Sequence, residues 1–180
     1  MSKRVTIRPA GSTDIDAIYR CLAGAFAAYR DHYTTAAFEN TVPPPDALQA
    51  RLSAMTILVA SEEAGIVGTI GCSCRGGGEG HLRGMAVTPA RHGHGIAQKL
   101  LGAAEDELRR AGCERVTLDT TAVLRRAIAF YEAAGYRRTG TISEFFGMEL
   151  IEYEKSLIRP ATPRSSAQKQ IGSQRHDISK

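Results

Sequence analysis

The stretch Val87-Thr-Pro-Ala-Arg-His-Gly-His-Gly-Ile-Ala-Gln-Lys-Leu-Leu101 (VTPARHGHGIAQKLL) joins an apolar, strand-like segment to an amphipathic helix. Two glycines, Gly93 and Gly95, stand at this junction, although one glycine and a capping residue are enough to turn a chain. Glycine lacks a Cβ, so a ligand can approach its backbone closely. A helix start also offers free N–H groups and the positive end of the helix dipole. The junction is therefore a candidate phosphate-binding loop, with a simple turn as the alternative interpretation.

Two well-known phosphate-binding motifs do not fit this loop. A Walker A motif needs GK[ST] after the glycines, and that sequence is missing. A dinucleotide fingerprint needs a third glycine where Gln98 stands, although Asp119 follows the next strand as a ribose-binding acid would. The strands before the loop are separated by short connections, which favour antiparallel hairpins over a doubly wound parallel sheet.

The pattern of apolar residues predicts an α/β (α+β) fold with a mixed, mostly antiparallel central sheet flanked by helices. Alternation predicts strands over 5–8, 56–61, 65–74, 81–87, 116–119, 136–142 and 148–157. Helical spacing predicts helices over 15–29, 46–54, 96–110 and 123–134. Residues 31–46 end in three prolines and are predicted to form a loop. The strand–helix–strand order over 81–119 implies one parallel crossover in the sheet.

Length and composition favour one globular domain over residues 1–158. The chain has 180 residues, of which 43% are hydrophobic and 23% charged. Residues 159–180 hold five basic residues and one acid, which equals the whole formal charge of +4. The body is therefore neutral and gives no electrostatic support for a nucleic-acid partner. The basic tail over 159–180 is poor in apolar residues, so we expect it to be disordered.

The cysteines and the apolar runs point to a cytoplasmic protein. No CxxC pair occurs among the four cysteines, which we expect to be reduced thiols. The N-terminus shows no signal-peptide pattern. The apolar runs are shorter than the roughly 20 residues of a membrane span, so no membrane partner is expected.

Two motifs together resemble the GNAT superfamily of acyl-CoA-dependent N-acetyltransferases. They lie in LRGMAVTPARHGHGIAQKLLGAAEDELRRAGCERVTLDT (82–120) and AIAFYEAAGYRRTG (127–140). The family's pyrophosphate loop, [Q/R]xxGx[G/A], falls on residues 92–97, with His92 where Gln or Arg is usual. The family's NxxAxxFYxxxGF motif falls on residues 124–136, with Leu124 in place of Asn. With its element order, the resemblance covers about residues 4–157.

The resemblance implies acetyl-CoA as co-substrate and a V-shaped splay between the two central strands. The exposed backbone of the splayed strand would pair with the pantetheine arm, and the glycine loop would hold the pyrophosphate. The cofactor-binding residues implied are Met85, Ala86, Val87, His92, Gly93, His94, Gly95, Ile96, Ala97 and Arg126.

Two side chains are candidates for catalysis. Tyr131 would protonate the departing thiolate, since a phenol with a pKa of about 10 keeps its proton at neutral pH; an aromatic core residue is the alternative. His81 occupies the position where several family members carry a glutamate base, and imidazole accepts protons near neutral pH. An exposed polar residue at the start of a strand is its alternative, and Glu79 is a second candidate base. His81, His92 and His94 together form a conceivable zinc set, but no carboxylate or cysteine supports it, so no metal is expected.

The expected function is acetyl transfer from acetyl-CoA to a primary amine by direct attack in a ternary complex. The acceptor is a small-molecule or peptide amine, and a homodimer is compatible with the family. The resemblance implies that residues 29–40, with Phe145 and Phe146 of the last hairpin, lie over the acceptor site. Because several of these residues are aromatic, we expect an acceptor with an apolar part. The alternative function is a non-catalytic acyl-CoA-binding sensor or interaction module.

Overall fold

A computed structural model describes residues 4–158, which fold around one seven-stranded sheet with the order β1-β2-β3-β4-β5-β7-β6. Every neighbouring pair is antiparallel except β4 and β5, which are parallel. This confirms the predicted α/β fold with a mostly antiparallel sheet. The strands are β1 (Thr6–Pro9), β2 (Thr56–Glu62), β3 (Gly65–Gly76), β4 (Glu79–Val87), β5 (Arg115–Thr120), β6 (Arg137–Phe145) and β7 (Met148–Ser156).

Five α-helices flank the sheet: α1 (Ile15–Phe26), α2 (Thr35–Thr41), α3 (Pro45–Ala54), α4 (Ile96–Arg110) and α5 (Arg125–Ala133). The prediction of a loop over 31–46 is wrong, because α2 lies inside it. Thr34 caps this helix by accepting a hydrogen bond from the Ala37 N–H at 3.2 Å. The prolines interrupt helical structure only between α2 and α3. Pro45 takes the first position of α3, where no backbone N–H is needed.

Two apolar clusters hold the helices to the sheet. The larger one contains the buried stripe of α4, formed by Ile96, Leu100, Ala104 and Leu108, and includes Tyr131 of α5. The smaller one joins α1 and α3 to β2 and to Ala86 of β4. None of the helices within residues 4–158 is long and apolar enough to cross a membrane. The predicted disordered tail lies outside the described residues.

Helix α4 packs closely because glycines of the sheet leave room for it. A methyl group at Gly68 of β3 would lie 2.8 Å from Leu100 Cδ1 and 3.2 Å from the Ala86 carbonyl oxygen. A methyl group at Gly80 of β4 would lie 2.7 Å from Leu108 Cδ1. The glycines thereby fix the position of the helix whose start, at Ile96, follows the glycine loop.

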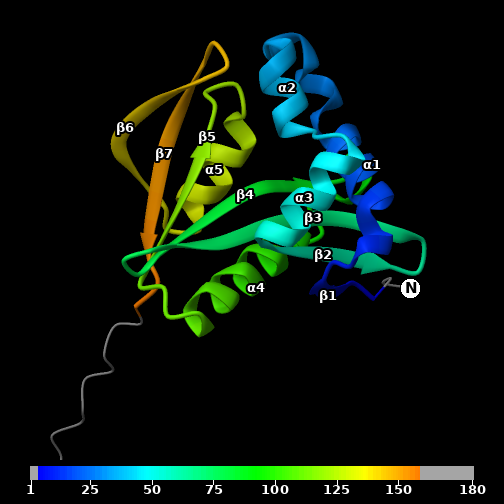
Figure 1. Ribbon diagram of the computed structural model, residues 1–180, viewed down its shortest axis with the longest axis horizontal. Coiled ribbons are helices and arrows are strands. Elements are labelled where there is room, and N and C mark those ends of the chain that lie inside the picture. Colours follow the sequence, from blue (N-terminus) through cyan, green and yellow to red (C-terminus); the bar gives the residue numbers. More distant parts are fainter. Residues whose placement is uncertain (1–3, 159–180) are drawn as a thin grey trace, which may run out of the picture.

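Strands β4 and β5 pair only at one end and then diverge, as Figure 1 shows. The parallel register runs from Glu79 opposite Arg115 to Leu82 opposite Leu118. Beyond Leu82, β4 continues along β3 to Val87, with an irregular register beside Gly84, whose φ is +61°. β5 instead continues with β7 toward the far hairpin. The predicted V-shaped splay between the central strands is thereby confirmed.

A buried ionic network ties α4 to the half of the sheet beyond the splay. Glu105 of α4, 5% exposed, accepts hydrogen bonds from Tyr136 Oη at 3.0 Å and from Lys155 Nζ at 2.8 Å. Arg109 adds a third contact at 3.2 Å. Because Lys155 lies on β7, this network links the two arms of the V at its closed end.

Candidate active site

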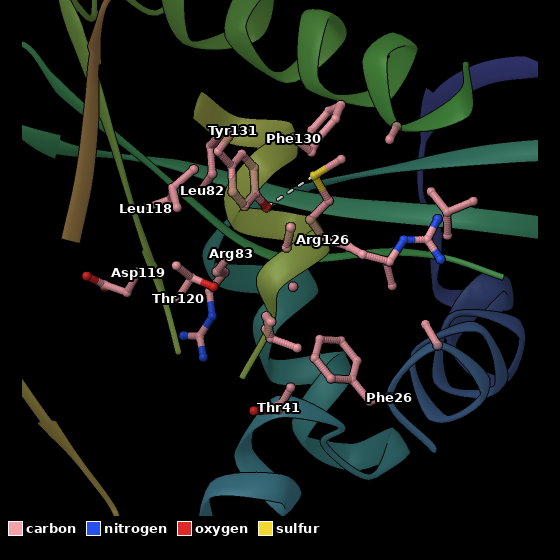
Figure 2. Close-up of a pocket in the computed structure, with 18 of the residues that line it drawn as sticks. Phe26, Thr41, Leu82, Arg83, Leu118, Asp119, Thr120, Arg126, Phe130 and Tyr131 are labelled. Atoms are coloured by element: carbon pink, nitrogen blue, oxygen red, sulfur yellow. Dashed lines mark hydrogen bonds between the residues drawn. The ribbon is translucent and has the colours of Figure 1, made fainter. Parts of the chain in front are cut away.

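The splay opens into a cavity of about 570 Å³ that brings most of the predicted site residues together (Figure 2). Its lining combines one wall from β4 and the start of α4, a second from β5 and α5, and a third from α1, α2 and α3. The predicted residues that line it are His81, Met85, Ala86, Val87, His92, Gly93, Gly95, Ile96, Ala97, Arg126 and Tyr131. The His94 side chain is exposed outside it and its Nδ1 lies 2.9 Å from the His92 carbonyl oxygen.

Backbone N–H groups without a partner among the described residues occur along residues 93–98 of the glycine loop, of which all but His94 line this cavity. Gly93 and Gly95 adopt left-handed conformations with φ of +80° and +72°, which favour glycine. Within residues 4–158, no carbonyl or side chain accepts a hydrogen bond from the backbone N–H groups of residues 93–98. The first N–H of α4 with a partner is that of Lys99, which donates to the Gly95 carbonyl at 3.2 Å. Such a cradle fits an anionic phosphate group.

His92 positions Arg126 beside the loop. Its Nε2 lies 2.9 Å from the Val87 carbonyl oxygen, and its Nδ1 lies 3.2 Å from Arg126 Nη1. A carbonyl only accepts and a guanidinium only donates, so Nε2 carries the proton and Nδ1 is the acceptor. In this arrangement the side chain joins the end of β4 to α5. The neighbouring Arg125 does not line the cavity.

Tyr131 belongs to both the core and the cavity. Its ring packs against Tyr136 and Phe130 with centroid distances of 5.7 and 5.5 Å, so the core interpretation holds for the ring. Its hydroxyl points toward the splayed part of β4 and donates to Met85 Sδ at 3.2 Å (Figure 2). Burial raises the pKa of this phenol above its ordinary value. The hydroxyl thus keeps its proton at any pH near neutrality.

His81 is a buried residue of the cavity wall, 7% exposed, which excludes the alternative of an exposed position. Its Nδ1 lies 3.0 Å from Thr117 Oγ1, and the Thr117 hydroxyl can donate to Glu79 Oε1 at 3.3 Å. In that arrangement Nδ1 carries the proton and the Nε2 lone pair faces Asp119 Oδ2 at 3.7 Å. Burial, aided by Arg75 and Arg83, lowers the pKa of His81 to about 4. The imidazole is neutral at physiological pH.

Further polar residues lie beyond His81; of these, the sequence pointed only to Asp119, and as a ribose-binding acid in the rejected dinucleotide motif. Burial, with a contribution from Glu152, raises the pKa of Asp119. Asn40 from α2, Arg51 from α3 and Arg83 from β4 meet around one amide oxygen, with Arg83 Nη2 at 3.1 Å and Arg51 Nη2 at 3.4 Å from Asn40 Oδ1. No local pattern signals this cluster, because its members come from three separate elements.

Two contacts close the cavity over this polar end. Tyr33 Oη lies 3.2 Å from Thr121 Oγ1, which joins the segment before α2 to the loop after β5. Thr34 Oγ1 donates to the Phe146 carbonyl at 2.7 Å and so holds the β6–β7 turn against α2. Residues 4–158 contain no group of three or more His, Cys, Asp or Glu side chains that could hold a metal ion.

Comparisons with known proteins agree with this architecture. The sequence is 31% identical over 86 residues to N-alpha-acetyltransferase 30 of Saccharomyces cerevisiae, and the match covers 48% of each chain. The chain thus spans about half the length of this curated relative. The structure resembles the PaiA N-acetyltransferase of Thermoplasma acidophilum, solved with coenzyme A, at a TM-score of 0.71 and 16% identity over 85% of this chain and 99% of that one.

A similar likeness extends to the ribosomal-protein-S18-alanine N-acetyltransferase of Escherichia coli. The TM-score is 0.70 at 18% identity, over 89% of this chain and 98% of that one. The family description "Acetyltransferase (GNAT) family" matches residues 16–136, which contain the splayed strands, the glycine loop and Tyr131. The chain therefore belongs to the GNAT family of acetyltransferases.

Proposed function

We propose that the protein transfers an acetyl group from acetyl-CoA to a primary amine by direct attack of the amine on the thioester. The observation that carries this proposal is the cradle of free N–H groups at residues 93–98, which opens into the same cavity as the Tyr131 hydroxyl. Acetyl-CoA, the co-substrate of this family, supplies a thioester carbonyl that accepts the amine and a sulfur that leaves as a thiolate.

The cofactor would be held by the glycine loop and by the open edge of β4. The free N–H groups at 93–98 are suited to the pyrophosphate, and Arg126 adds a positive charge at the same end of the cavity. Met85, Ala86 and Val87 lie where β4 has no partner in β5, so their backbone is available to an extended chain. His92 would contribute by holding Arg126 beside the loop.

Tyr131 is suited to donate a proton to the leaving thiolate. Its raised pKa keeps the phenol protonated, and its hydroxyl already points to a sulfur atom, Met85 Sδ, at the splay. A donor placed where negative charge develops stabilises the transition state without reorganising. The packed ring holds that hydroxyl in place.

His81 and Asp119 are suited to receive the amine. An ammonium group donates hydrogen bonds only, and these residues place the Nε2 lone pair and a carboxylate oxygen 3.7 Å apart in the cavity wall. His81 would take the proton that the ammonium group must lose before its nitrogen can attack, and would pass it to Asp119 or solvent. With a pKa of about 4, the imidazole would carry that proton only briefly. The second proton, which the nitrogen loses as the amide forms, balances the proton that Tyr131 gives to the thiolate.

The test is thiol release from acetyl-CoA over a panel of primary amines, together with calorimetry of CoA binding. We expect CoA to bind and thiol release to depend on an amine, with the acetylated amine found by mass spectrometry. Tight CoA binding without turnover on any amine would contradict the proposed enzymatic function and favour the alternative, a non-catalytic acyl-CoA-binding sensor. Failure to bind CoA would refute both.

A further inference from the structure

We infer that the acceptor amine also carries a carboxylate, which Arg83 and Arg51 bind at the end of the cavity remote from the glycine loop. This inference rests on the proposed amine acetylation and narrows its substrate class.

The first observation is that the two guanidinium groups have no acidic partner. Among residues 4–158, no carboxylate oxygen lies within 4.0 Å of Arg51 or Arg83, and the charge of Asp119 reaches Arg83 only from beyond that distance. Two other arginines of the cavity wall do have carboxylate partners, whereas Arg126 has none in the described part of the chain. Arg91 pairs with Glu62 at 2.8 Å, Arg75 lies 3.8 Å from Glu79, and Arg126 contacts His92.

The second observation is the close approach of these two cations. Arg51 and Arg83 both point an Nη2 at the same neutral atom, Asn40 Oδ1, at 3.4 and 3.1 Å. Burial and the nearby Arg83 lower the pKa of Arg51 to about 10. Two like charges around one amide repel each other, and an anion between or beside them would relieve that repulsion.

A purely structural role for Arg51 and Arg83 would use only some of their N–H donors. Arg51 Nη2 also donates to the Asn40 carbonyl and so caps the end of α2. A guanidinium has five N–H donors, and Asn40 engages one nitrogen of each. The remaining donors of Arg83 are available in the cavity, into which its side chain reaches.

Arg83 lies away from Arg126, the arginine beside the glycine loop. Figure 2 shows Arg83 and Arg126 pointing in different directions, with Arg83 toward Thr41 of α2. Among the described residues that line the cavity, Asp119 is the one with an acidic side chain. Figure 2 shows it on the same side of α5 as Arg83. One carboxylate for an ammonium and two guanidiniums for a carboxylate match the charges of a zwitterionic amino acid, and Phe26 and Tyr29 of the same wall suit an apolar side chain.

The experiment compares matched acceptors that differ only in the carboxylate. Free L-amino acids are assayed beside their amides, and peptides with a second-residue aspartate are assayed beside their asparagine counterparts. We expect kcat/KM to be at least about tenfold higher for the carboxylate member, because only that member makes charge-assisted hydrogen bonds to the two guanidiniums. The two sets distinguish an α-carboxylate from a side-chain carboxylate.

The decisive variant is Asn40→Asp, which supplies an internal carboxylate to both arginines and removes neither. We expect it to raise KM for the carboxylate acceptor about tenfold while the neutral partner and the Kd of CoA stay within about twofold. Asn40→Ser is the matched neutral control and should keep the preference. Arg83→Gln should lose it.

The outcomes separate the two proposals. Equal turnover of carboxylate and neutral amines, or an Arg83→Gln variant that loses only thermal stability, overturns this inference and leaves amine acetylation standing. A loss of CoA affinity in Arg83→Gln would assign the pair to the cofactor and also overturn it. Absence of turnover on every amine would refute the proposed function, and this inference with it.

Discussion

At the scale of single residues, Tyr131 is the most direct test of the chemistry. Its ring belongs to the core and its hydroxyl to the cavity, so Tyr131→Phe removes the donor and keeps the packing. We expect kcat to fall about 100-fold, within the range of general-acid contributions, with little change in the KM for acetyl-CoA. Steady-state kinetics check this.

The matched control is Tyr153→Phe, a fully buried phenol on β7 that does not line the cavity. That variant should keep the wild-type kcat. Because the pKa of Tyr131 is raised, the wild-type enzyme should show no loss of kcat from its ionisation up to pH 10. A Tyr131→Phe enzyme with an unchanged kcat would remove Tyr131 from the mechanism.

His81 couples the site to stability through its pKa. The folded pKa of about 4 lies below the ordinary value of 6.5 for a free imidazole, so the unfolded chain binds more protons between these values. The contribution of His81 to the free energy of unfolding is therefore fully present above pH 6.5, and it is lost as the pH falls toward 4. We expect a loss of about 3 kcal/mol over this window.

Denaturant titrations at pH 7, 5.5 and 4.5 measure this contribution by comparing wild type with His81→Gln. The difference between the two proteins isolates His81 from the carboxylates that titrate in the same range. The stability of the variant should depend less on pH. Parallel curves for the two proteins would mean that the imidazole is protonated in the fold as easily as in water.

At the scale of elements, the position of α4 depends on glycines in the sheet. A methyl group at Gly68 would overlap Leu100 and approach the Ala86 carbonyl oxygen, so Gly68→Ala should destabilise the protein by about 1–3 kcal/mol. Gly102→Ala on α4 itself meets no atom within 4 Å and should stabilise it by up to about 1 kcal/mol. Thermal and urea unfolding compare the two variants.

The network around Glu105 gives a second test at this scale. Glu105→Gln leaves Lys155 on β7 without its anionic partner while keeping the shape of the side chain. We expect a destabilisation of about 3 kcal/mol, because breaking a buried ion pair leaves a charge uncompensated. Glu107→Gln, whose partner Arg110 is exposed, should change the stability by less than about 1 kcal/mol.

The sequence predicted elements and local motifs better than contacts between distant elements. The stripe of α4 and the glycine loop follow from spacing within one segment, and both were predicted correctly as structure. Glu105 stands four residues after the buried Leu101, yet its burial depends on Lys155, 50 residues away. The cluster at Asn40 was missed for the same reason, and the helix that carries it was hidden by the prolines that follow.

At the scale of the whole molecule, the two arms of the V should be stabilised by the ligand between them. A ligand present at 100 times its Kd adds about 2.7 kcal/mol to the stability of the folded state. For a domain of this size that corresponds to a rise in Tm of roughly 5–10 °C. We expect CoA to produce this shift in a thermal melt.

Arg126→Gln and Arg125→Gln form a matched pair for this measurement. Both side chains are exposed at the start of α5, but Arg126 alone of the two lines the cavity and contacts His92. At equal CoA concentration the shift should shrink for Arg126→Gln and stay unchanged for Arg125→Gln. Equal shifts would exclude Arg126 from the cofactor site.

The divergence of β4 from β5 also bears on how the protein avoids aggregation. An unpaired strand edge normally invites a strand of another molecule to pair with it. Here the open edge of β4 beyond Leu82 lies inside a cavity walled by α1 and α5, rather than at the border of the sheet. A second polypeptide strand with its side chains would have to displace these helices to reach it. The same walls thus favour a narrow chain that carries no amino-acid side chains, and they keep the edge from acting as a template for self-association.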